Sequence, residues 1–162
     1  MRTSTKITAV VGGAALTLAT AGVAFAYWTQ NGTGSGNAVN ASAKDGAITL
    51  TATVPAGLAP GTGGAVSFAA SNSSTTTDGY VASLKVTSIT ANQSCSVADF
   101  SFVSDSASTT SLVNTAITEN TIIPAGGAST ALPTGGYLKF ANSASNQDNC
   151  KGATITLNLT SV

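Results

Sequence analysis

Strict alternation of apolar and polar residues is the feature that most constrains how this chain can fold. Ile155, Leu157 and Leu159 alternate with threonine and asparagine residues. Successive side chains of a β-strand point to opposite faces, so this pattern predicts a strand with one buried face. The same period of two recurs at Ile48 to Val54, at Val66 and Phe68, at Tyr80, Ala82, Leu84 and Val86, at Phe100 and Phe102, and at Leu138 and Phe140.

Clusters of proline and glycine separate these stretches. Proline fixes φ and glycine tolerates positive φ, so each cluster predicts a turn. Short strands joined by such turns predict an all-β fold, an antiparallel β-sandwich of about 7–9 strands. Residues 104–121 stay open, because their polar repeats fit a loop while Leu112, Val113 and Ile117 fit a strand or a short helix. The predicted turns are at residues 55–57, 59–61, 124–127 and 133–136.

Residues 1–26 have the pattern of an export signal that forms an N-terminal signal helix. A basic start precedes an apolar run from Ile7, and the small residues Ala24 and Ala26 predict cleavage before Tyr27. The apolar run is also close to the roughly 20 residues that span a bilayer, so an uncleaved anchor is the alternative. We therefore expect a secreted, extracellular or cell-surface protein that meets the membrane only through this segment.

The rest of the chain divides into residues 27–43, an N-terminal strand and tether, and residues 44–162, the sandwich domain. Tyr27 and Trp28 precede a series rich in glycine, asparagine and serine that leads to Val39. Such a composition is typical of a flexible tether behind an aromatic strand. Tyr27, Trp28 and Val39 are therefore candidate residues of an assembly strand that pairs with the sheet edge of a neighbouring copy. The alternative is that Tyr27 and Trp28 begin the first strand of their own domain.

Cys95 and Cys150 are the only cysteines. Export implies an oxidising environment, and a disulfide closing a loop of this length stabilises a fold by about 4 kcal/mol in the chain-entropy model. We expect this disulfide. Two buried thiols are the alternative.

Charge and composition exclude several functions. The only arginine is Arg2, and the lysines that follow residue 26 are scattered, so nucleic-acid binding is not expected. The absence of histidine removes the usual base of serine and cysteine nucleophiles and the commonest zinc ligand. The carboxylates available for acid–base chemistry have no paired spacing, so we predict no enzyme, no catalytic residues, no cofactor and no metal. These carboxylates are Asp99, Asp105, Glu119 and Asp148.

Two weaker binding signals have structural alternatives. Asn146 to Asn149 offers oxygen ligands for calcium, but a polar turn that brings Cys150 to its partner explains the same residues. Tyr80, Tyr137 and Trp28 would line a carbohydrate-binding face if they aligned, whereas separate burial in the core is the expectation for the two tyrosines.

Three stretches in order along the chain resemble the camelysin and TasA group of exported proteins, in an actinobacterial branch. They are Ala26-Tyr27-Trp28-Thr29 at the processing site; Leu58-Ala59-Pro60-Gly61, which leads through Val66-Ser67-Phe68 to Ser71-Asn72-Ser73-Ser74; and Asn149-Cys150-Lys151-Gly152-Ala153-Thr154 before the final alternating strand.

The resemblance implies an immunoglobulin-like sandwich, a signal processed by a dedicated peptidase, and a structural protein of the cell surface, cell wall or biofilm matrix. Such proteins assemble into fibres by exchange of a terminal strand, so self-association through sheet edges is the expected partnership. The Cys95–Cys150 pair and the short chain depart from the pattern of that group. A secreted monomeric module that binds polysaccharide or a surface protein is therefore the alternative function.

Overall fold

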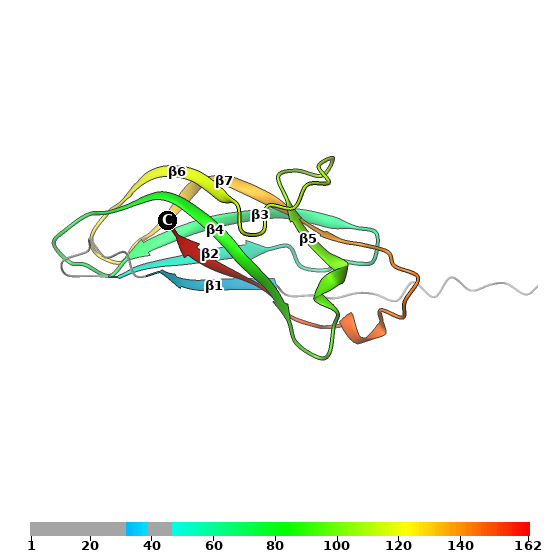
Figure 1. The fold of residues 1–162 in the computed structure, drawn as a ribbon. Helices are drawn as coiled ribbons and strands as arrows, with labels where there is room; N and C mark the ends of the chain where they lie inside the picture. The colour runs from blue at the N-terminus through cyan, green and yellow to red at the C-terminus, as the bar shows by residue number, and fades with distance from the viewer. Residues whose placement is uncertain (1–31, 39–46) are drawn as a thin grey trace, which may run out of the picture.

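Two antiparallel sheets form the described part of the chain, which confirms the predicted all-β sandwich (Figure 1). The computed structural model describes residues 32–38 and 47–162. Two short 3-10 turns, η1 (Val97–Asp99) and η2 (Asp148–Cys150), accompany the strands. The strands are β1 (Gly32–Ala38), β2 (Ile48–Val54), β3 (Gly63–Asn72), β4 (Gly79–Ala91), β5 (Phe100–Val103), β6 (Ala116–Ile123), β7 (Ser129–Phe140) and β8 (Ile155–Ser161).

Some strands that follow each other in the sequence pair in one sheet, and others lie in different sheets. The larger sheet has the order β1-β2-β3-β7-β5, and the smaller has the order β6-β4-β8. β4 pairs with β6 along its first half and with β8 along its second half. β2 and β3 are neighbours in one sheet, whereas the second and third strands of an immunoglobulin domain lie in opposite sheets.

The core lies between the sheets, and the alternating apolar residues of β2 and β8 belong to it as predicted. Ile48, Leu50, Ala52 and Val54 of β2 are buried while Thr51 and Thr53 are exposed. β8 also alternates, with partly exposed residues between its buried ones. Aromatic rings fill the middle, with Phe68 and Phe102 edge to face and Phe100 stacked on Phe140. The buried positions of β8 are Ile155, Leu157 and Leu159.

The alternation predicted for Tyr80 to Val86 is wrong in the first half of β4. Tyr80 is 46% exposed and Ala82 is also exposed, whereas Val81 and Leu84 are buried. The pairing with β6 shifts register between Val81 and Ser83. Such a bulge turns the strand, so residues of opposite parity face the core on its two sides.

The predicted turn at residues 133–136 is also wrong, because these residues lie inside β7. The register between β3 and β7 shifts here, and β5 pairs with β7 only from Tyr137 onward. Proline is tolerated at such a position because its missing N–H falls at a bulge on a locally unpaired edge. Gly136 permits close packing, since a Cβ there would lie 2.2 Å from the ring of Phe102.

The other predicted turns are confirmed. Gly57, Gly61, Gly126 and Gly127 all have positive φ, which glycine adopts without a steric penalty. Residues 104–115, which the sequence left open, form a loop, and β6 begins at Ala116.

This loop covers the outer edge of β5. The Leu112 N–H donates to the Phe102 carbonyl at 2.8 Å, and Lys139 Nζ donates to the Ser108 carbonyl at 2.5 Å. The loop therefore occupies one backbone acceptor of the edge strand β5, which hinders the pairing of another strand there. Within the described ranges, no helix is long and apolar enough to cross a membrane.

Candidate functional site

The two sheets approach each other along two sides of the sandwich. On one side β6 lies beside β7, and on the other β2 approaches β8. β1 lies at this second side, where it pairs with β2 and also runs alongside β8 (Figure 1). We call the space between β2 and β8 the β2–β8 seam.

β1 pairs with β2 over its whole length, from Gly32 opposite Val54 to Ala38 opposite Ile48. Its sequence, Gly-Thr-Gly-Ser-Gly-Asn-Ala, contains no charged residue and no large apolar residue. The strand is therefore held in place mainly by its backbone hydrogen bonds to β2.

The glycines of β1 occupy every second position, in register with the buried residues of β2. Gly32, Gly34, Gly36 and Ala38 lie opposite Val54, Ala52, Leu50 and Ile48. Residues opposite each other in an antiparallel pair share a face of the sheet. The positions of β1 on the core face are thus all glycine or alanine.

β1 corrects the interpretation of the glycine-rich series before Val39 as a flexible tether, since Gly32–Ala38 is a paired strand. Glycine has a low strand propensity, but pairing with β2 overrides it. The signal that would have found the strand is the period of two in its glycines. The predicted assembly residues Tyr27, Trp28 and Val39 lie outside the described residues, as do Ala24 and Ala26 of the signal.

The opposite side of the sandwich is joined by a buried carboxylate. Glu119 of β6 is 4% exposed, and its Oε2 accepts the Thr134 N–H of β7 at 3.2 Å. The Thr134 hydroxyl also donates to Glu119 Oε1. Sequence reasoning considered Glu119 only as one acid among several and missed this structural role.

The predicted disulfide between Cys95 and Cys150 is confirmed, with an S–S distance of 2.00 Å. It joins the segment after β4 to η2, just before β8. Gln147 holds the second segment in place, because its side-chain amide donates to the Ala141 carbonyl at 2.9 Å. This contact fits the interpretation of residues 146–149 as a polar turn that brings Cys150 to Cys95.

The structure disperses the acids that the sequence singled out. Asp105 caps its own loop, and Asp148 forms an exposed ion pair with Lys151 at 2.6 Å. The hydrogen bond and charge of Lys151 lower the pKa of Asp148. Among the described residues, no three histidine, cysteine, aspartate or glutamate side chains are grouped so that they could hold a metal ion.

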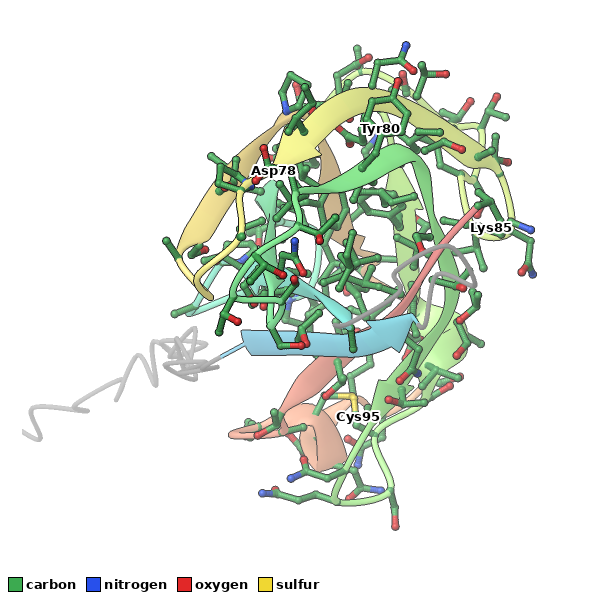
Figure 2. All side chains as sticks on the ribbon, turned by 90° about the vertical axis from the view of Figure 1, so that its left-hand side faces the viewer. Asp78, Tyr80, Lys85 and Cys95 are labelled. Atoms are coloured by element: carbon green, nitrogen blue, oxygen red, sulfur yellow. A yellow bond between two sulfur atoms is a disulfide. The ribbon has the colours of Figure 1, made fainter. Side chains whose placement is uncertain are left out.

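Neither tyrosine is buried in the core, and the two lie on different sheets. Tyr80 projects from the smaller sheet, away from β1, and donates to Asn120 Oδ1 at 2.8 Å (Figure 2). Tyr137 is partly exposed on β7 of the larger sheet, where it lines an open hollow of about 480 Å³ with Lys139 and Ser101. The expected burial of both tyrosines is therefore wrong.

The chain matches no family model, no curated protein and no solved structure.

Proposed function

We propose that this chain is a secreted or cell-surface structural protein that self-assembles into extracellular fibres by exchange of its N-terminal strand. The observation that carries this proposal is the placement of β1 in the β2–β8 seam. A strand held by backbone pairing at a sheet edge can be replaced by the same strand of another copy with no loss of contacts. Head-to-tail exchange of this kind extends into a filament, whereas reciprocal exchange closes a dimer.

The connection between β1 and β2 supports exchange over closure. Residues 39–47 separate the paired residues Ala38 and Ile48. Most hairpin loops have about two to five residues, so this connection is longer than pairing within one chain requires. An extended chain spans about 3.3 Å per residue, which gives β1 a reach of roughly 30 Å toward a neighbour.

A pair of introduced cysteines distinguishes exchange from closure. Thr33 lies opposite Thr53, which is exposed, so Thr33→Cys with Thr53→Cys places two thiols within disulfide distance wherever β1 occupies a seam. After oxidation across a concentration series, exchange gives a ladder of covalent oligomers on a non-reducing gel and filaments in negative stain. A monomer band in which the two introduced cysteines are joined within one chain, at every concentration, overturns the proposal.

Thr33→Cys with Ser67→Cys is the matched control. Ser67 is exposed and lies opposite Thr53 on β3, two strands from Thr33. Two strand spacings amount to about 10 Å, which is too far for a disulfide. A ladder in this control as well would mean that the oligomers arise from random collision.

The second candidate function is a secreted monomeric module that binds polysaccharide. The hollow beside Tyr137 favours it, because a partly exposed ring with hydroxyl and ammonium groups nearby suits sugar recognition. Quenching of tyrosine fluorescence on addition of cell-wall glycan, lost in Tyr137→Ala but retained in Tyr80→Ala, would support this function. No response to any glycan in the wild-type chain would remove it.

A further inference from the structure

We infer that the β2–β8 seam accepts only a strand that carries glycine or alanine at every second position, and that its partner in assembly is the β1 strand of a second copy. This inference rests on the proposed function and specifies what the seam selects. It starts from the register, in which Gly32, Gly34 and Gly36 lie opposite Val54, Ala52 and Leu50.

Both sheets contribute buried apolar side chains beside the seam. Leu50 of β2 and Leu157 of β8 are fully buried, and Ile48 and Ile155 are 1% exposed. β1 contacts both β2 and β8, and β2 and β8 also contact each other. We expect a branched side chain at a position of β1 that shares this face to crowd these buried residues, and overpacking of this kind is destabilising.

The alternate register positions of β1 carry no such restriction. Thr33, Ser35 and Asn37 lie opposite Thr53, Thr51 and Thr49, of which Thr51 and Thr53 are exposed. β-branched residues suit a position that shares the solvent face of a strand pair. The seam therefore requires small residues only at every second position of the inserted strand. The sequence Gly-x-Gly-x-Gly-x-Ala of β1 meets this requirement.

Valine at adjacent positions tests this rule in the full-length exported chain that carries the Thr33→Cys and Thr53→Cys pair. Gly34→Val should slow formation of the introduced disulfide, within or between chains, at least about tenfold, because this position shares the core face. Ser35→Val should leave the rate within about twofold, because this position shares the solvent face. Gly34→Ala should also pair normally, which separates side-chain size from the backbone freedom of glycine.

Equal rates for Gly34→Val and Ser35→Val, or a loss of pairing in Gly34→Ala as large as in Gly34→Val, would overturn the inference. Failure of the proposed function has a different signature. In that case every variant gives monomers. The introduced disulfide within the chain still forms slowly in Gly34→Val alone, so the requirement for small residues holds for pairing within one chain.

Discussion

Glu119 and Thr134 connect the two sheets of the sandwich through a carboxylate that accepts both the backbone N–H and the hydroxyl of one residue. The contact lies on the side opposite β1, where β6 runs beside β7. Glu119 is buried and Thr134 is partly exposed, so the loss of Glu119 would remove the acceptor of two partly buried hydrogen bonds.

Glu119→Ala should therefore lower the free energy of unfolding by about 2 kcal/mol, because two hydrogen bonds of roughly 1 kcal/mol each are lost. Urea denaturation followed by circular dichroism measures this change. Thr118→Ala, at the exposed neighbouring position, should change stability by less than about 0.5 kcal/mol. Equal effects of the two substitutions would show that the Glu119–Thr134 contact does not stabilise the sandwich.

The disulfide should contribute about 4 kcal/mol, because the sequence separation of 55 residues makes a large loop whose closure restricts the unfolded chain. Cys95→Ala with Cys150→Ala should lower the urea midpoint accordingly. Addition of reductant should bring the wild-type chain to a similar midpoint and leave the double variant unchanged. A midpoint that does not respond to reductant in the wild-type chain contradicts this prediction.

Asp105 should titrate well below an ordinary aspartate. The hydroxyls of Ser108 and Ser104 and the N–H groups of Ala107 and Ser108 donate to its carboxylate and lower its pKa to about 2. A lowered pKa means that these bonds stabilise the loop above the unfolded pKa of about 3.8 and that this contribution is lost as the pH falls toward 2.

Carboxyl carbon shifts in nuclear magnetic resonance measure this titration directly. Ser108→Ala should raise the midpoint of Asp105 toward that of a model peptide, because it removes the first of these donors. Ser106→Ala removes none of the four bonds and should leave the midpoint unchanged. A wild-type midpoint near that of a model peptide would mean that the loop does not hold Asp105 in this arrangement.

Much of the fold was predictable because burial in a sandwich alternates along each strand. The apolar positions of β2 and β8 are buried as the period of two predicts, and the only cysteine pair forms the expected disulfide. The failures share a physical origin. The bulge near Val81 and the strand that runs through Pro133 depend on pairing with other strands, which local sequence does not encode.

The candidate site was predictable only in part. The predicted assembly residues Tyr27, Trp28 and Val39 lie outside the described residues and stay a prediction, whereas the glycine-rich stretch between Trp28 and Val39 was assigned to a tether and contains the paired strand β1. Propensity argues against a strand at Gly32–Ala38, and only the register with β2 gives its alternating glycines a meaning. The Glu119–Thr134 contact was not predictable, because it joins positions on different sheets.

The disulfide also changes how the chain responds to mechanical tension. A pull on the two ends is transmitted through the sulfur atoms, so the residues between Cys95 and Cys150 bear no load. β5, β6 and β7 all lie in the segment between the two cysteines. When fully extended, this segment would span about 190 Å at roughly 3.4 Å per residue. An oxidised copy of the protein therefore lengthens under force by that much less than a reduced copy.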